Sequence, residues 1–200
     1  MSATERVRVG VHVFDGAEEL DWVGPYEILA MWASLAEPPG VEVVTVAWEE
    51  GPVRCAKGLR FLPDTTVAAL GDVDVLVYPG GRGTRAQLGD ERITGWLRDL
   101  HAAGTLLVSV CTGSLVLADA GLLDGRPATT HHGSLDLLGR LGRDLEVRPD
   151  DRFVDDGDLV TAAGVSAGID VALHLVARLA GRDLARQVRR AVQYDPDPPV

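Results

Sequence analysis

The chain has 200 residues, of which 46% are hydrophobic and 24% are charged, and its formal net charge is −11 at pH 7. This length and balance are typical of a globular domain that buries a substantial core without disulfide or metal staples, and they exclude a disordered or fibrous chain. Because phosphate groups repel a polyanion, we expect neither nucleic acid nor a membrane surface as a direct partner, and we favour a small uncharged or cationic substrate.

The alternation of strand and helix patterns predicts the fold class. Runs of β-branched or apolar residues indicate strands, and apolar residues at helical spacing indicate helices. Repeated β-α-β order with buried strands implies a three-layer α/β/α sandwich with a mainly parallel sheet, in a single domain over residues 1–200, with the reactive site at the carboxyl ends of the strands. The expected elements are strand 7–14, helix 20–35, strand 41–48, hairpin 53–62, strand 73–78, helix 90–103, strand 105–110, helix 111–120, helix 134–141, hairpin 152–161, helix 166–180 and a last helix from about 183 to 192, with a loop at 37–40 and a frayed end at 195–200.

The sharpest local signal surrounds Cys111, where an apolar strand runs directly into small residues that begin a helix (VSVCTGSL, 108–115). This has the form of a nucleophile elbow, in which a strained turn holds the Cys and Gly113 leaves room for the close approach of strand and helix. We expect the start of the helix to stabilise a thiolate and lower the pKa of Cys111. The alternative, a small buried hydrophobe, fits Cys55 better, because Cys55 lies in a predicted hairpin without such a setting.

Gly80 and Gly81 end another buried strand (YPGGRGT, 78–84). Glycines at that place let backbone N–H groups point at a developing negative charge, as an oxyanion hole does. A Gly-Gly pair after a strand is often only a turn. We interpret this one as an oxyanion hole because it occurs together with the Cys elbow.

Three carboxyl groups follow the first strand, on Glu18, Glu19 and Asp21. A carboxyl beside a thiolate should have a raised pKa and can serve as general acid and base. Consecutive acids are more often solvated loop charges. Asp21 is flanked by Leu20 and Trp22, so it is the one we expect to be partly buried.

His131 and His132 follow the Cys in a TTHHG segment (129–133). Thiol proteolysis would need such a His beside the Cys. A His at a strand end is more often structural, bonding a backbone group, and this is the interpretation we favour. His12, His101 and His174 lie within predicted elements, and we expect no chemistry from them.

Cys55 and Cys111 are the only cysteines, and they fit no metal-ligand spacing. Residues 1–7 have no apolar core of signal-peptide length, and no stretch approaches the roughly 18 apolar residues that span a bilayer. We therefore expect a cytoplasmic protein whose thiols stay reduced.

Six segments together resemble the DJ-1/PfpI superfamily, with its class I glutamine-amidotransferase-like, flavodoxin-type fold, and within it the isonitrile (isocyanide) hydratase branch. The resemblance covers nearly the whole chain, from Val9 to about Pro199. The segments are LDWVGP (20–25), YPGG (78–81), SVCTGSLVL (109–117), AGLLDGRPATTH (120–131), AGID (167–170) and YDPDPP (194–199).

The resemblance implies an enzyme that adds water to an isonitrile and releases an N-substituted formamide, without metal or organic cofactor. Members are typically homodimers, and Trp22, Tyr26 and Trp32 would leave apolar surface on a monomer, so we expect a homodimer. The implied site consists of Cys111 as nucleophile, Asp21 as general acid and base, Thr112 as a hydroxyl or backbone donor, and Gly80, Gly81, His131 and His132 as oxyanion or substrate-binding residues.

Two positions depart from family patterns. Proteases of the superfamily carry a His immediately after the Cys, where this chain has Thr112, and this disfavours proteolysis. The hydratase branch commonly has Trp where this chain has His132, so we expect a different substrate pocket.

Two other functions stay open. One is a non-catalytic ligand or redox sensor whose Cys111 oxidises to sulfinate; the same motifs occur in AraC-type regulators that continue into a helix-turn-helix, whereas this sequence ends at Val200. The other is glyoxalase-like or deglycase-like activity on dicarbonyls. A charged residue from the segment 131–132 lining the pocket would favour dicarbonyls, and an apolar dry pocket would favour isonitriles.

Overall fold

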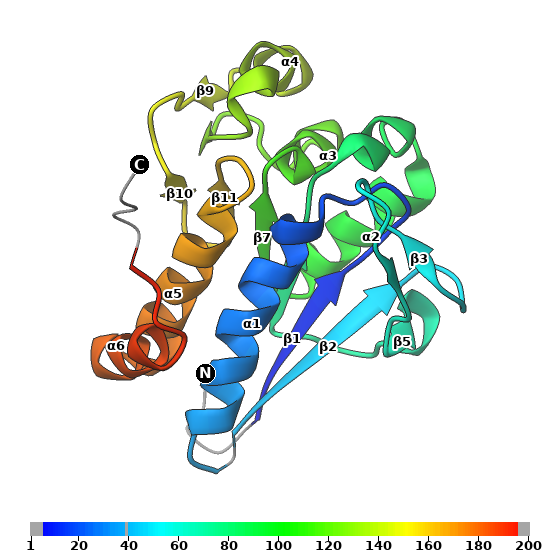
Figure 1. Cartoon of the computed structure of the whole chain (residues 1–200). Helices are drawn as coiled ribbons and strands as arrows, with labels where there is room; N and C mark the ends of the chain where they lie inside the picture. Colours follow the sequence, from blue (N-terminus) through cyan, green and yellow to red (C-terminus); the bar gives the residue numbers. More distant parts are fainter. Residues whose placement is uncertain (1–5, 39, 196–200) are drawn as a thin grey trace.

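A seven-stranded sheet forms the centre of the computed structural model, which describes residues 6–38 and 40–195 (Figure 1). Its order is β10-β11-β7-β6-β1-β2-β5, and every neighbouring pair is parallel except β10 and β11. The predicted α/β class with a mainly parallel sheet is confirmed. The strands are β1 (Val7–His12), β2 (Val41–Ala47), β5 (Thr65–Thr66), β6 (Val75–Tyr78), β7 (Leu106–Val110), β10 (Phe153–Asp155) and β11 (Leu159–Ala162).

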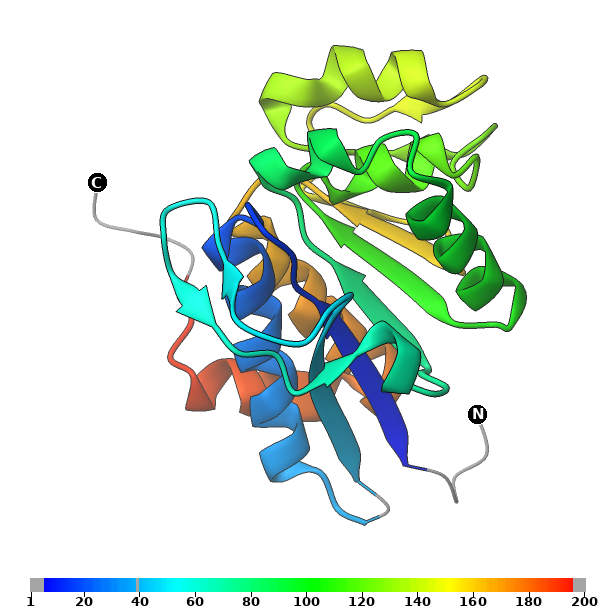
Figure 2. The same cartoon turned by 90° about the vertical axis from the view of Figure 1, so that its right-hand side faces the viewer.

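Helices cover both faces of this sheet (Figures 1 and 2). On one face α1 (Glu19–Leu35), α5 (Ala167–Ala180) and α6 (Arg182–Ala191) contact one another. On the other face lie α2 (Glu91–Ala102) and α3 (Gly113–Asp119), which are in contact, and α4 (Leu135–Leu141) packs on α3. Strands covered on both sides have no solvent face, and accordingly every residue of β6 and β7 is buried.

Short elements complete the chain. The predicted hairpin at 53–62 is confirmed as the antiparallel pair β3 (Val53–Arg54) and β4 (Arg60–Phe61). A second pair, β8 (Pro127–Ala128) and β9 (Glu146–Val147), is parallel and has no counterpart in the predicted elements. Three single turns of 3-10 helix are η1 (Val67–Ala69), η2 (Arg82–Ala86) and η3 (His132–Ser134).

Some predictions fall on residues that are not described. They are residues 1–5 of the N-terminal segment, Pro39 of the loop at 37–40, and residues 196–200, which hold most of the YDPDPP match and of the expected frayed end. Over the rest of the chain, no helix has the length and apolar character needed to cross a membrane.

The tryptophans of α1 do not leave apolar surface on a single chain. Trp22 is 4% exposed and Trp32 is 2% exposed, and Tyr26 is half-buried against the core. The Trp22 ring packs on Phe61 of β4, with ring centroids 4.7 Å apart. The expectation that these side chains leave apolar surface on a monomer is therefore wrong, because they are buried within the chain itself, Trp22 in part by the β3–β4 hairpin. The homodimer stays a prediction from family resemblance alone.

His12, the last residue of β1, is fully buried among aromatic rings. Its ring centroid lies 4.8 Å from that of Tyr78, 5.3 Å from that of Trp96 and 5.5 Å from that of Phe14. Neither ring nitrogen has a hydrogen-bond partner among the described residues. Burial lowers the pKa of His12 from 6.5 to about 3, so the imidazole is neutral in the folded protein.

We expect His12 to destabilise the fold as the pH falls below 6.5, because the unfolded chain then binds a proton that the folded chain cannot. From the two pKa values this loss reaches about 2 kcal/mol at pH 5. His12→Phe keeps an aromatic ring but does not titrate. The free energy of unfolding of this variant, relative to wild type, should therefore rise by about 2 kcal/mol between pH 7 and pH 5 in urea titrations.

Val160→Ala is the matched control, because Val160 is a fully buried core residue that does not titrate. Its free energy of unfolding should keep a constant difference from wild type over the same pH range. A constant difference for His12→Phe as well would contradict the assignment of a neutral, buried imidazole.

Candidate active site

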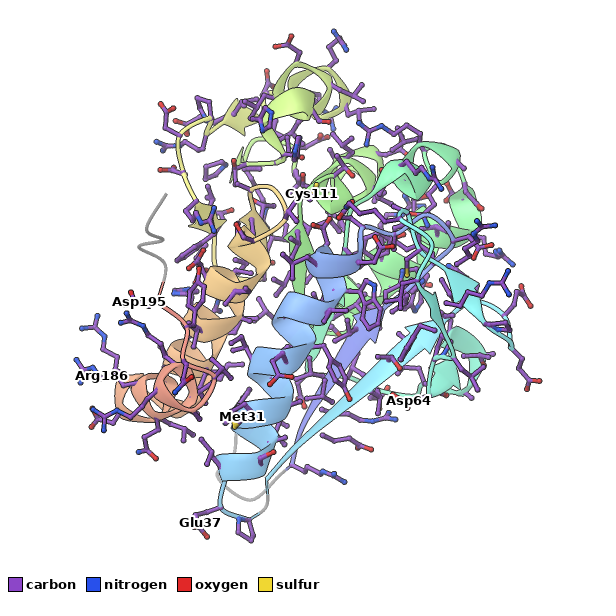
Figure 3. All side chains as sticks on the ribbon, in the orientation of Figure 1. Met31, Glu37, Asp64, Cys111, Arg186 and Asp195 are labelled. Atoms are coloured by element: carbon purple, nitrogen blue, oxygen red, sulfur yellow. The ribbon has the colours of Figure 1, made fainter. Side chains whose placement is uncertain are left out.

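Three neighbouring strands, β1, β6 and β7, bring the expected site residues to one edge of the sheet. Cys111 follows β7, Gly80 and Gly81 follow β6, and the loop after β1 leads into α1, whose first turn carries Asp21. Figure 3 shows Cys111 at this edge, near the starts of α1 and α3. The chain passes from β1 to β2 on one side and on to β6 and β7 on the other, so a crevice opens where the strand order reverses.

The predicted strand-to-helix turn is present at Cys111. Its φ is 56°, in the left-handed region that non-glycine residues rarely adopt. The backbone N–H of Cys111 donates to the carbonyl oxygens of Ala162 and Ala163, both at 3.0 Å. Its own carbonyl oxygen accepts from the hydroxyls of Thr130 at 2.8 Å and Ser114 at 3.2 Å. These bonds from three other segments hold the strained turn.

Two backbone N–H groups, those of Thr112 and Val165, face the Cys111 sulfur and act to lower its pKa. Val165 is β-branched and has a φ of 50°, so its backbone is also strained. No sequence motif predicts a role for Val165. Its only signal is its position two residues before the AGID segment, because a backbone donor leaves no trace in side-chain chemistry.

Asp21 is completely buried, although it lies in the first turn of a surface helix. Its Oδ2 accepts from the N–H of Gly80 at 3.0 Å, and its Oδ1 has no hydrogen-bond partner among the described residues. Burial raises the pKa of Asp21 from 3.8 to about 7, against the opposing effects of Cys111 and of the Gly80 N–H. A carboxyl with this pKa can both take up and release a proton near neutrality.

The pKa of Cys111 is raised, to about 12, and not lowered as expected from the elbow. Burial is the largest cause and the negative charge of Asp21 is the second, and together they outweigh the N–H groups that face the sulfur. The two groups form a coupled pair. Near neutral pH the shared proton resides on the sulfur, and a thiolate forms when that proton moves to Asp21.

The N–H groups of Gly80 and Gly81 are not free to bind an oxyanion, which corrects the expectation for both residues. Gly80 donates to Asp21, and Gly81 donates to the Thr112 hydroxyl at 2.9 Å. A Cβ on Gly80 would lie 2.4 Å from the Thr112 nitrogen and 2.9 Å from Asp21 Oδ2. The N–H groups of the two glycines therefore position the acid and the turn, while Gly81 also lines the pocket over Cys111.

Thr112 contributes its backbone N–H to the sulfur, while its hydroxyl is engaged elsewhere. Besides accepting from the Gly81 N–H, the hydroxyl lies 3.2 Å from the Gly81 carbonyl oxygen and 3.1 Å from the hydroxyl of Thr84. Of the two roles expected for Thr112, hydroxyl donor or backbone donor, the geometry favours the backbone donor. Its hydroxyl instead holds the loop after β6.

A pocket of about 450 Å³ lies over Cys111. It is lined by Glu18, Gly81, Arg82, Arg85, Cys111, Thr112, His131, Gly133, Ser134 and Val165.

His131 lines this pocket, but His132 does not. The Nδ1 of His131 accepts from the Gly133 N–H at 3.1 Å, which is the structural bond expected for it, and its ring packs against the backbone of Gly164. Burial, His132 and Arg85 lower the pKa of His131, so this ring is neutral. The expectation that His132 lies at the site was wrong, because its side chain is exposed and does not line the pocket; its ring lies against that of His131, with ring centroids 4.2 Å apart.

Glu18 and Glu19 are not merely solvated loop charges. Glu18 reaches the pocket and pairs with the ammonium group of Lys57. The Oε1 of Glu19 accepts from the backbone N–H of Lys57 at 2.7 Å. Both side chains therefore tie the β3–β4 hairpin to the start of α1. Cys55 is completely buried in the same hairpin and lies outside the pocket, as expected of a structural cysteine.

Within ranges 6–38 and 40–195, no three His, Cys, Asp or Glu side chains are grouped so that they could hold an ion.

Comparisons with known proteins agree with this geometry. The family model described as DJ-1/PfpI family matches residues 7–178. Isonitrile hydratase of Pseudomonas putida is 42% identical over 193 residues, which cover 96% of this chain and 81% of that protein. A ThiJ/PfpI family protein from Pseudomonas syringae superposes with a TM-score of 0.88 at 34% identity, over 98% of this chain and 78% of that one. DJ-1beta of Drosophila melanogaster has a TM-score of 0.84 at 25% identity, over 96% and 100% of the two chains.

We expect iodoacetamide to modify Cys111 faster than Cys55 in the native protein at pH 7. Cys111 lines an open pocket and has Asp21 to receive its proton, whereas Cys55 is fully buried. Peptide mass spectrometry after timed quenching measures the two rates. In denaturant the rates should converge, and equal rates in the native state would contradict a special environment for Cys111.

Proposed function

We propose, from the premise that this chain belongs to the DJ-1/PfpI family, that it hydrates isonitriles to N-substituted formamides. Support comes from its 42% identity to an isonitrile hydratase and from the pairing of a nucleophilic thiol with a buried acid. A nucleophilic thiol must stay reduced, so we place the enzyme in the cytoplasm, and we propose a homodimer on family resemblance.

The observation that carries the proposal is the juxtaposition of Cys111 and Asp21. Isonitrile hydration needs a nucleophile for the terminal carbon and a group that both accepts and delivers protons. A carboxyl with a pKa near 7 beside a thiol meets both needs at neutral pH.

In the first step the Cys111 sulfur adds to the terminal carbon of the isonitrile. Asp21 accepts the thiol proton as the carbon–sulfur bond forms, and then delivers it to the same carbon. The product is a thioimidate in which that carbon carries one hydrogen, one sulfur and a double bond to nitrogen. The N–H groups of Thr112 and Val165 stabilise the sulfur while its charge is transient.

In the second step water attacks the thioimidate carbon, and Asp21, again ionised, accepts a proton from that water. Asp21 then delivers this proton to the nitrogen as the double bond to it is lost. Collapse of the tetrahedral adduct breaks the carbon–sulfur bond, releases the formamide and returns the second proton of the water to the Cys111–Asp21 pair. The overall change is addition of one water to one isonitrile, with no oxidant or reductant.

The polar lining of the pocket supports a second candidate function, glyoxalase-like or deglycase-like activity on dicarbonyls. The charged side chains of Arg85 and Glu18 line the pocket together with the neutral imidazole of His131, so the pocket is not uniformly apolar. A formamide assay with alkyl and aryl isonitriles, run beside a methylglyoxal assay, distinguishes the two candidates. Turnover of methylglyoxal with inert isonitriles would favour the second, and inertness to both would favour a sensor.

Asp21→Asn keeps the shape of the side chain but cannot accept or deliver a proton. We expect it to lose roughly 10²–10⁴-fold in formamide production, the range typical of general acid–base catalysis. Cys111→Ala should lose all turnover, because the covalent step needs the sulfur. Formamide release is measured by chromatography, and circular dichroism checks folding.

Glu19→Gln is the matched control, because it removes a carboxylate from the same helical turn outside the pocket lining. It should retain most activity, with a modest loss of stability from the weakened bond to the hairpin. Near-normal formamide production by folded Asp21→Asn would rule out the role assigned to this carboxylate.

The value of kcat/KM should rise with pH through about 7, because Asp21 must be ionised to accept the thiol proton. Below that pH burial keeps Asp21 protonated, and the first step loses its base. Initial rates from pH 5 to pH 9 test this. His131→Ala should retain some turnover and the same rise, and a pH profile that moves with His131 instead of Asp21 would contradict the assignment.

A further inference from the structure

Arg82 and Arg85 line the pocket over Cys111 without a carboxylate partner. Neither forms an ion pair with an acidic side chain in the described part of the chain, where most of the other basic side chains do. The chain has 30 acidic against 19 basic residues, so a partner would be easy to supply. Two guanidinium groups without an acidic partner among the described residues line the pocket over a reactive thiol, and such groups can bind an anionic ligand.

Arg85 is held in place by hydroxyls of buried residues. Its Nη1 donates to Thr84 Oγ1 at 3.0 Å and its Nη2 donates to Ser134 Oγ at 2.9 Å. Thr84 is 0% exposed and Ser134 is 5% exposed. A guanidinium carries five N–H donors, so three remain for a ligand after these two bonds, in the forked arrangement that matches a carboxylate.

The same hydroxyls connect Arg85 to the reactive centre. The Thr84 hydroxyl lies 3.1 Å from that of Thr112, the residue next to Cys111. Two hydrogen bonds therefore separate the guanidinium from the turn that carries the sulfur. An anionic group bound to Arg85 and an isonitrile carbon at Cys111 can belong to one small molecule, and a pocket of about 450 Å³ leaves room for the chain between them.

The acids nearest the pocket do not neutralise this charge. Glu18 is paired with Lys57, and Asp21 is buried and bonded to Gly80. The pocket is therefore locally cationic. This differs from the uncharged or cationic substrate favoured by the net charge of −11, because net charge averages over the surface and does not describe one concave site.

We propose that Arg85, assisted by Arg82, is an anion subsite that binds a carboxylate at the far end of the substrate. The substrate class is then isonitriles that bear a carboxylate, which rests on the proposed hydratase function. Neither arginine takes part in the proton transfers; they orient the substrate so that its isonitrile carbon reaches the sulfur.

The test compares ω-isocyanohexanoate with its primary amide, which has the same length and no charge. At low ionic strength the wild-type protein should show a kcat/KM for the carboxylate roughly two- to fivefold above that for the amide, in the range of an exposed charge pair, mainly through KM. Added salt should shrink this preference. Arg85→Gln should abolish it.

Arg190→Gln is the matched control, since Arg190 is an exposed arginine of α6. Figure 3 places α6, marked by Arg186, far from Cys111. This variant removes the same charge and should keep the preference. If Arg85→Gln does not fold, Arg85→Lys is the second variant. It retains the charge but loses the forked N–H donors of arginine, so it should keep only part of the preference. The salt dependence of the preference is measured on the wild-type protein and requires no variant.

Equal kcat/KM for carboxylate and amide in the wild type, or an undiminished preference in folded Arg85→Gln, would overturn the proposal while leaving the hydratase function intact. If no isonitrile is turned over, the hydratase function fails, and the subsite is tested separately. Hexanoate should then slow iodoacetamide modification of Cys111 more than hexanamide does, and equal protection by the two would overturn the subsite.

Discussion

The backbone of Gly80 holds the first turn of α1, which carries Asp21, beside the turn that carries Cys111. The geometry of the site depends on this contact. The Gly80 N–H donates to Asp21, its carbonyl oxygen accepts from the N–H of Glu18 at 2.9 Å, and its Cα faces the Thr112 nitrogen so closely that a Cβ would lie 2.4 Å away. Residues 18–21 and residue 112, far apart in the sequence, thus meet at Gly80, where there is no space for a side chain. The parallel sheet makes this meeting possible, because β1, β6 and β7 end at the same edge.

The site is assembled against local preference at several points. A carboxyl is buried with one oxygen unpartnered, a thiol is buried beside it, and Cys111 and Val165 both adopt positive φ. Each of these features costs stability, and each gives the chemistry something that a relaxed arrangement would lack: a proton acceptor with a pKa near neutrality, a sulfur that lines the pocket, and a backbone N–H that faces the sulfur. The fully buried strands on either side of the site offset these costs.

The sequence was sufficient for the layer architecture and for the pair of Cys111 and Asp21. Apolar runs identify buried strands, and the match of residues 20–25 to the family pattern singles out Asp21, whereas Leu20 beside it is exposed. It was insufficient wherever backbone groups decide the outcome. The N–H groups of Gly80 and Gly81 already have partners in the folded chain, Val165 acts through its N–H alone, and burial overrides the helix start in setting the pKa of Cys111. Two expectations about exposure were wrong because tertiary contacts decide which side chains reach solvent. His132, expected in the pocket, is exposed, and Trp32, expected to leave apolar surface on a monomer, is buried.

The aromatic enclosure of His12 has a consequence for the way folding handles protons. Between about pH 4 and pH 6.5 an unfolded chain holds a proton on this imidazole and none on Asp21, whereas burial lowers the pKa of His12 to about 3 and raises that of Asp21 to about 7 in the folded chain. Folding in this range therefore transfers one proton from an imidazole to a carboxyl, and the two groups together neither release nor absorb any. Their effects on acid stability oppose and nearly cancel, so the neutral acid at the reactive edge leaves little mark on the pH dependence that these two groups give the free energy of unfolding.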